Sequence, residues 1–137
     1  MTRYLLDTNI VSEIRKPKPH GAVAAWFGGL RDEQICLSAV TLAELQEGVE
    51  RTRRQDAAKA RAIEAWVDDL EQSSTVLPMD ARCFRETARM MVGRPDDLLY
   101  DLMIAATARL HGLTIATRNE KDFRPLGVDI INPFKSH

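Results

Sequence analysis

Three acidic residues interrupt apolar segments that lie far apart in the chain. Asp7 ends the first apolar run, Glu44 lies within segment 40–45, and Asp101 lies within the small-residue segment 100–108. A carboxylate in such surroundings is costly, because desolvation disfavours the charged form unless the group is paired, caps a helix or holds a cation. We therefore predict that the three carboxylates converge on a metal ion.

The donor atoms indicate which metal and which chemistry. Clustered carboxylates raise one another's pKa unless a cation offsets their repulsion. Oxygen ligands suit Mg²⁺, with Mn²⁺ as a substitute, whereas Cys36 and Cys83 lack the spacing of a zinc site. A divalent cation with open positions activates water and neutralises phosphoryl oxygens, so the predicted chemistry is hydrolysis of a phosphodiester.

Each acid also has a structural interpretation that remains open. Asp7 could cap a helix, where a carboxylate accepts hydrogen bonds from free backbone N–H groups. The spacing of Thr41 and Glu44 matches a capping box. Asp101 is harder to explain in this way, because the two aspartates that follow Pro95 are the expected caps of its helix.

Short apolar segments alternate with helical patterns along the chain. This alternation predicts an α/β fold whose parallel sheet is covered by helices on both faces. The expected strands are 3–6, 34–37, 75–77, 113–116 and 128–131, and the main expected helices are 22–27, 40–52, 56–70 and 97–110.

The predicted strands place the acids at one edge of the sheet. Asp7 follows the first strand, Glu44 lies in the helix after the second, and Asn119 and Asp122 follow the fourth. Asp101 enters from the helix before the fourth strand. Parallel sheets bind ligands outside the carboxyl ends of their strands, so these side chains are expected to share one rim.

Composition sets further bounds. The 137 residues, 45% of them hydrophobic, fit one globular domain over 1–137. A net charge of −1 gives no global sign of a nucleic-acid binder. Two distant cysteines do not support a disulfide framework, and neither a signal peptide nor an apolar run of about 18 residues is visible. We expect a cytoplasmic protein without a membrane segment.

Four stretches together resemble the PIN-domain nucleases, and most closely the VapC-type toxins with their FitB-like branch. They are segments 5–9, 41–45, 100–108 and 116–123, which run in order over nearly the whole chain. The resemblance implies a three-layer α/β/α sandwich with a central, mostly parallel sheet of about four to five short strands. It also implies an Mg²⁺-dependent endoribonuclease, inhibited by a small cognate antitoxin whose tail occupies the active groove, and it favours a homodimer.

The resemblance carries over to particular residues. Asp7, Glu44 and Asp101 match the three acidic positions of the family. At the fourth position, where many PIN domains have an aspartate, this chain has Asn119, with Asp122 three residues later. The fourth metal ligand is therefore either of these two, and a weaker second metal site becomes possible.

Other polar residues are candidates for positioning the substrate. Thr8, Asn9 and Thr117 are predicted to support Asp7 or the RNA by hydrogen bonds. Two groups of arginines could neutralise phosphates, although solvated helix faces with ordinary ion pairs explain them equally well. The groups are Arg82, Arg85 and Arg89 at helical spacing, and Arg51, Arg53 and Arg54 after the Glu44 helix.

Two other functions fit part of the pattern. An aspartyl phosphatase also places its nucleophile after the first strand, but it needs a second aspartate two residues on, where this chain has Asn9. A non-catalytic module could retain the acidic cluster only to dock a basic partner peptide. Metal-dependent hydrolysis of RNA separates the nuclease from both.

Overall fold

Five short strands form one parallel sheet in the computed structural model, which describes residues 1–135. The strand order is β3-β2-β1-β4-β5, and every neighbouring pair is parallel. The predicted α/β class and parallel sheet are therefore confirmed. The strands are β1 (Tyr4–Leu6), β2 (Ile35–Ser38), β3 (Thr75–Leu77), β4 (Thr114–Ala116) and β5 (Ile130–Ile131).

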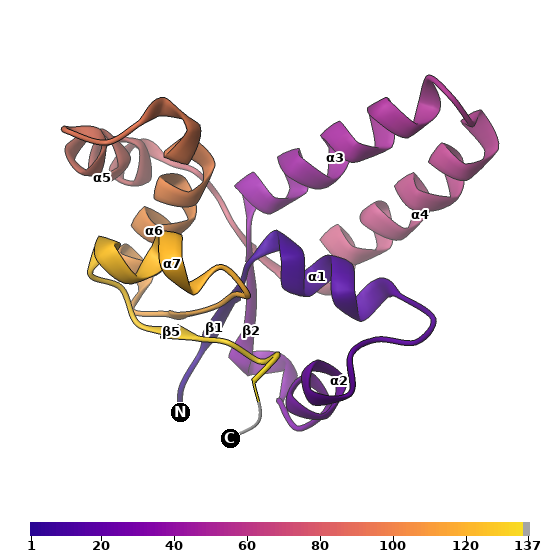
Figure 1. Cartoon of the computed structure of the whole chain (residues 1–137), viewed down its shortest axis with the longest axis horizontal. Helices are drawn as coiled ribbons and strands as arrows, with labels where there is room; N and C mark the ends of the chain where they lie inside the picture. The colour runs from indigo at the N-terminus through magenta and orange to yellow at the C-terminus, as the bar shows by residue number, and fades with distance from the viewer. Residues whose placement is uncertain (136–137) are drawn as a thin grey trace.

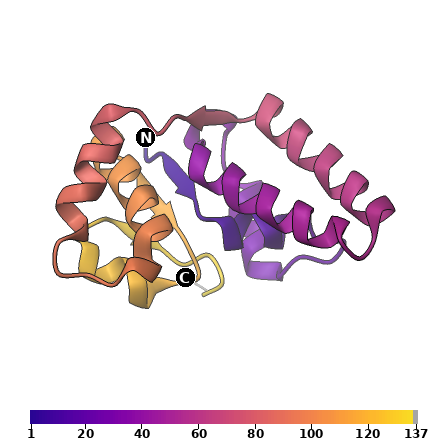
Figure 2. The same cartoon turned by 90° about the horizontal axis from the view of Figure 1, so that it is seen from above.

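Helices cover both faces of this sheet, as the sequence predicted. One layer contains α1 and α2, and the other contains α5, α6 and α7 (Figure 1). The long helices α3 and α4 lie side by side and extend away from α5 and α6 (Figure 2). The bounds are α1 (Thr8–Arg15), α2 (Gly21–Gly28), α3 (Ala39–Arg53), α4 (Ala57–Ser73), α5 (Ala81–Met91), α6 (Leu99–His111) and α7 (Glu120–Phe123).

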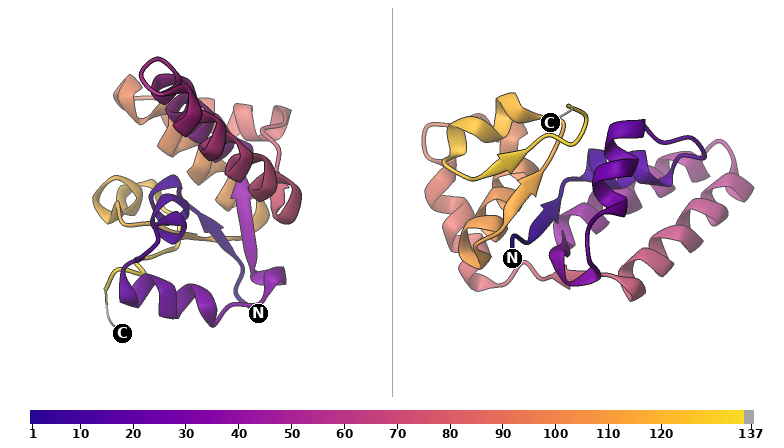
Figure 3. Two further views of the ribbon diagram at one scale, coloured as in Figure 1. Left: turned by 90° about the vertical axis from the view of Figure 1, so that its right-hand side faces the viewer. Right: turned by 90° about the horizontal axis from the view of Figure 1, so that it is seen from below.

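The central strands are buried on both faces, which produces two hydrophobic cores. Leu5 and Ile115 pack into the core under α5 and α6, whereas the next residues, Leu6 and Ala116, pack into the core under α1 and α2. Successive side chains of a strand point to opposite faces, so one short apolar run supplies both layers. Figure 3 shows the sheet between these layers.

The start of α6 differs from the prediction. Asp96 and Asp97 do not cap this helix, because residues Asp96–Leu98 form a separate 3₁₀ turn and α6 begins at Leu99. Tight 3₁₀ turns are common where a helix begins. Asp101 therefore lies in the first turn of α6, close to the sheet edge, instead of one turn inside the helix.

A glycine ends α6 one residue beyond the predicted range. Gly112 caps the helix in the left-handed conformation, with φ of 64°, and its backbone N–H faces the carbonyls of Ala108 and Arg109. This conformation disfavours residues that carry a Cβ atom. Within residues 1–135, no helix is long and apolar enough to cross a membrane.

Two glycine-to-alanine substitutions should change stability in opposite directions. A Cβ atom meets no neighbour at Gly112 or at Gly48 within α3, so backbone conformation alone decides the sign. Gly112→Ala should lower the free energy of unfolding by about 1 kcal/mol. Gly48→Ala should raise it by roughly 0.5 kcal/mol, because alanine loses less backbone entropy in a helix. Urea denaturation of both variants tests this, and equal effects would contradict the assigned conformations.

Candidate active site

The acidic residues gather at the carboxyl edge of the sheet. Asp7 directly follows β1, and Glu44 lies in the second turn of α3, which follows β2. Asp122 lies in α7 after β4, and Asp101 lies in the first turn of α6. Since α6 leads into β4 and runs back along the sheet, its first turn comes to the same edge, and α6 contacts both α3 and α7 there (Figure 1).

Asp7 is the most firmly held of these carboxylates. It is 5% exposed and accepts hydrogen bonds from the Thr117 hydroxyl at 2.7 Å, the Thr8 backbone N–H at 2.8 Å and the Asn9 side-chain amide at 3.2 Å. Burial raises the pKa of Asp7, and these three hydrogen bonds oppose the rise. The bond from Thr8 also makes Asp7 the N-cap of α1, so the capping interpretation of this residue is confirmed.

Glu44 is coupled to Asp7 through a threonine. The Thr8 hydroxyl donates to the Glu44 Oε1 atom at 2.8 Å and lies 3.3 Å from the Thr41 hydroxyl. The capping-box interpretation was wrong, because Ser38 caps α3 and Thr41 is buried inside the first turn. Burial raises the pKa of Glu44, and the charge of Asp7 adds to the rise.

Asp101 is the least compensated carboxylate of the group. Within residues 1–135, its side chain receives no hydrogen bond and no ion pair. Burial raises the pKa of Asp101 to about 6, and the charges of Asp7, Asp122 and Glu44 contribute to the rise. The other acids therefore lie close enough to repel it, and no described basic group offsets them.

The fourth position is shared between an amide and a carboxylate. The side-chain amide of Asn119 donates to the Asp122 Oδ2 atom at 2.8 Å, and its backbone N–H donates to the Thr117 hydroxyl at 2.9 Å. Asn119 thus orients Asp122 and connects it to the group that holds Asp7. Of these two residues, Asp122 is the one whose negative charge raises the pKa of Asp101.

A contact that the sequence did not predict ties the two sides of the site together. The Tyr100 hydroxyl donates to the Glu47 carboxylate at 2.5 Å, which joins the start of α6 to α3. Tyr100 directly precedes Asp101, and Glu47 lies one turn after Glu44, so this bond fixes the two acids relative to each other. The only sequence signal was this adjacency, because the approach of the two helices depends on the tertiary fold.

The carboxylates do not form a closed cage. Among residues 1–135, no three His, Cys, Asp or Glu side chains lie close enough to hold a metal ion by themselves. The charges of Asp7, Asp122 and Glu44 nevertheless raise the pKa of Asp101, so these acids lie close enough to repel it. Such an arrangement suits a cation that keeps several ligand positions for water and phosphate, as Mg²⁺ does.

The structure does not bring Arg82, Arg85 and Arg89 to this centre. These exposed side chains line a hollow of about 240 Å³ with Leu110 near the far end of α6. At a rise of 1.5 Å per residue, Leu110 lies roughly 14 Å from Asp101 along the helix axis. This group is therefore separate from the acidic residues.

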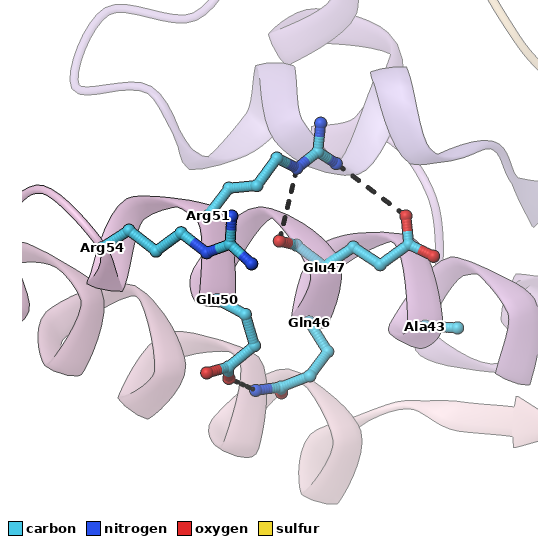
Figure 4. A pocket seen from close by; sticks show the side chains of 6 residues that line it. All are labelled: Ala43, Gln46, Glu47, Glu50, Arg51 and Arg54. Carbon is cyan, nitrogen blue, oxygen red and sulfur yellow. Dashed lines mark hydrogen bonds and ion pairs between the residues drawn. The ribbon is translucent and has the colours of Figure 1, made fainter.

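Of the arginines predicted to follow the Glu44 helix, Arg51 and Arg53 instead lie in the last turn of α3, and both pair with neighbouring acids. Arg53 pairs with Glu50 at 3.0 Å and with Glu64 of α4 at 2.7 Å. Arg51 folds back onto the carbonyl and carboxylate of Glu47 (Figure 4). The hollow drawn in Figure 4 is lined only by residues of α3 and by Arg54, which directly follows this helix. It is therefore an open surface of one helix.

Comparison with known proteins assigns this geometry to a family. The family model of the PIN domain matches residues 4–127, which include all four carboxylates. The chain belongs to the PIN-domain family. The resemblance seen in the sequence is thereby confirmed, and the three-layer fold is the one shared by the relatives below.

Curated relatives place this PIN domain among the toxins. It is 35% identical to the VapC ribonuclease Y4jK of Sinorhizobium fredii, over 96% of this chain and 97% of that protein. It is 34% identical to the toxin FitB of Neisseria gonorrhoeae, over 95% and 97%. The chain is therefore a member of the VapC and FitB toxin ribonuclease family.

Solved structures give the same placement. The structure titled FitAB bound to an IR36 DNA fragment has a TM-score of 0.84 at 30% identity, covering 98% of this chain and 97% of that one. A member of the VapBC family of toxin–antitoxin systems from Mycobacterium tuberculosis has a TM-score of 0.67 at 26% identity, with 96% and 99% covered. The fold of the PIN domain is thus shared along nearly its full length.

Removing the Asp101 charge should stabilise the metal-free protein near neutral pH. The folded-state pKa of about 6 lies above the usual 3.8, so the folded state binds a proton more tightly than the unfolded state. Stability is therefore lost as the pH rises from about 4 to about 6, and Asp101→Asn escapes this loss. Because the group is partly exposed, we expect a gain of only about 1 kcal/mol, or roughly 4 °C in Tm.

Thermal denaturation in excess chelator at several pH values measures this effect. The difference between Asp101→Asn and wild type should be largest above neutral pH and should vanish in acid. Asp97→Asn removes the exposed charge that contributes least to the rise in the pKa of Asp101, so it serves as the control, with a much smaller change expected. A destabilised Asp101→Asn protein at neutral pH would show that this carboxylate is structural.

Proposed function

We propose that this PIN domain is an Mg²⁺-dependent endoribonuclease and the toxin of a toxin–antitoxin pair. One observation supports the proposal most directly: Asp101 carries a charge among three other carboxylates without a described donor or basic partner. A protein would not retain this repulsion for stability, because neutral residues in the same place cost less. A bound cation removes it.

The residues present fit Mg²⁺. Asp7, Glu44, Asp101 and Asp122 offer oxygen atoms only, which is the donor set of a hard cation. Mg²⁺ is commonly bound through one or two carboxylates of the protein and keeps its other positions for water and substrate phosphate. When bound, the cation would supply the positive charge that neutralises the phosphoryl oxygens of the scissile bond. Mn²⁺ has similar requirements and should substitute.

The protein residues have distinct tasks in this proposal. Three hydrogen bonds fix the orientation of Asp7 and leave part of its lone-pair capacity free to bind the cation. Thr8 holds Glu44 in the same way. Asp101 is not engaged by other described groups, so it is available to orient the water that attacks the phosphorus. Asn119 holds Asp122 at the same edge.

Asn9 occupies the position at which the phosphatase alternative needs an acid. Its amide nitrogen donates to Asp7, and its oxygen accepts a hydrogen bond from the Arg118 backbone N–H at 3.2 Å. Both ends of the side chain are thus used to position Asp7. No group there can protonate a leaving oxygen, which favours the nuclease.

The proposed protein partner is inferred from the acidic centre and from the similar solved structures. The similar structures include VapBC and FitAB complexes, and we propose that a small cognate antitoxin neutralises this chain in a corresponding complex. The uncompensated acids complement a basic side chain, which would compete with the cation for the same position. Inhibition should therefore accompany loss of metal binding.

Cleavage of RNA tests the activity. Antitoxin-free protein should cut a mixed single-stranded RNA pool in Mg²⁺ or Mn²⁺ and should be inactive in excess chelator. Asp7→Asn, Glu44→Gln and Asp101→Asn should each lower the rate at least about 100-fold, because each removes a negative ligand from the cation. Gel analysis of initial rates measures the loss.

Two controls make this result decisive. Asp97→Asn, purified in parallel, should keep full activity and excludes a contaminating nuclease as the source of cutting. Isothermal titration with Mg²⁺ should show binding to wild type and weakened binding to Asp101→Asn. Metal binding without any cutting, at the activity level of Asp101→Asn, would instead support the non-catalytic module.

A further inference from the structure

Arg118 lies at the rim of the acidic centre and is held there by its backbone. It directly follows Thr117, which donates to Asp7, and its own N–H donates to the Asn9 oxygen at 3.2 Å. The side chain itself is exposed. The position of this residue is therefore tied to two of the groups that orient Asp7.

An aromatic ring fixes the direction of this side chain. The Arg118 guanidinium carbon lies 4.7 Å from the centroid of the Phe134 ring, which is a cation–π distance. The Phe134 ring also contacts the His20 ring, with centroids 5.1 Å apart. Stacking holds a guanidinium by its face and leaves its N–H donors at the edge free.

The segment that carries this ring is anchored by partly buried hydrogen bonds. The Phe134 backbone N–H donates to the Asn132 oxygen at 3.0 Å, and the Asn132 amide donates to Glu120 at 3.0 Å. Asn132 is only 8% exposed. A chain of contacts from α7 through the segment after β5 thus ends at the Arg118 side chain.

No described acidic group pairs with the positive charge of Arg118. Among the described residues it forms no ion pair, in contrast to Arg53 and Arg89. The neighbouring acid Glu120 already binds Arg124 at 2.8 Å and Lys135 at 2.6 Å. A fixed, unpaired guanidinium at the edge of an acidic centre is arranged to receive an anion that this centre repels.

We propose that Arg118 is a positioning residue that binds a phosphate of the RNA strand beside the scissile phosphodiester, and that Phe134 fixes the guanidinium for this contact. The inference rests on the proposed ribonuclease function. Under this inference, the positive charge that binds the RNA strand is that of Arg118, at the rim of the site. The arginine group near Leu110 then makes no direct contact with the reacting phosphate.

The salt dependence of RNA binding tests the inference. A fluorescein-labelled single-stranded RNA pool of fixed length is bound to Asp101→Asn protein, whose cutting is expected to be at least about 100-fold slower, from about 50 to about 200 mM salt. Adding Arg118→Ala should weaken binding about tenfold. It should also reduce the slope of log K against log salt by about 0.7, the value for one phosphate contact on a single strand.

Further variants separate charge from folding. Arg118→Lys should restore the slope, because it keeps the charge. Phe134→Leu should keep the slope and weaken binding about threefold, because it removes only the stacking surface. Arg31→Ala makes the same charge change on an exposed residue before β2, at the opposite edge, and should leave both affinity and slope nearly unchanged. Circular dichroism establishes that each variant is folded.

The outcomes are distinguishable. A slope for Arg118→Ala equal to that of its parent, in a protein whose wild type cuts RNA, overturns this inference alone. The same reduction in slope for Arg31→Ala also overturns it, because the effect would then reflect net charge. If the wild type neither binds nor cuts RNA, the proposed function fails and this inference fails with it.

Discussion

Mutual repulsion among buried and partly buried carboxylates is the constraint that the rest of this structure must accommodate. The charges are brought to one edge because parallel strands end there and because α6 begins there. The groups that hold them are neutral hydroxyls and amides, such as those of Thr117, Thr8 and Asn119. A lysine or arginine in their place would orient an acid equally well but would neutralise it. Neutral donors fix the geometry and leave the charge available to a cation.

The carboxylate of Asp7 both stabilises the fold and belongs to the candidate site. One oxygen of this carboxylate accepts from Thr8 and so caps α1, while the other accepts from Asn9 and Thr117. Leu5 and Leu6, which directly precede Asp7, pack into the two hydrophobic cores on opposite faces of the sheet. Under the proposed function, changes to Asp7 therefore affect stability and chemistry together, whereas changes to Asp101 affect chemistry more than packing, because the described residues give Asp101 no hydrogen bond.

The sequence predicted what depends on local pattern and on the rules of parallel sheets. Apolar runs located the strands, and strand order along the chain placed Asp7 and Glu44 at one edge. The capping box failed because Ser38, three residues before Thr41, satisfies the same local preference and starts the helix earlier. The Tyr100 and Glu47 bond and the stacking of Arg118 on Phe134 depend on how distant helices and loops approach, which no local pattern encodes.

The central place of β1 in the sheet has a consequence for the order of assembly during synthesis. This strand emerges first, yet it pairs on one side with β4, and the bond between Asp7 and Thr117 joins residues 110 positions apart. Contacts of such long range form late, since the whole intervening chain must be ordered around them. A ribosome must release β4 and Thr117 before this bond can form. The nascent domain therefore carries Asp7 apart from its partner until the 110 residues that follow it have been released.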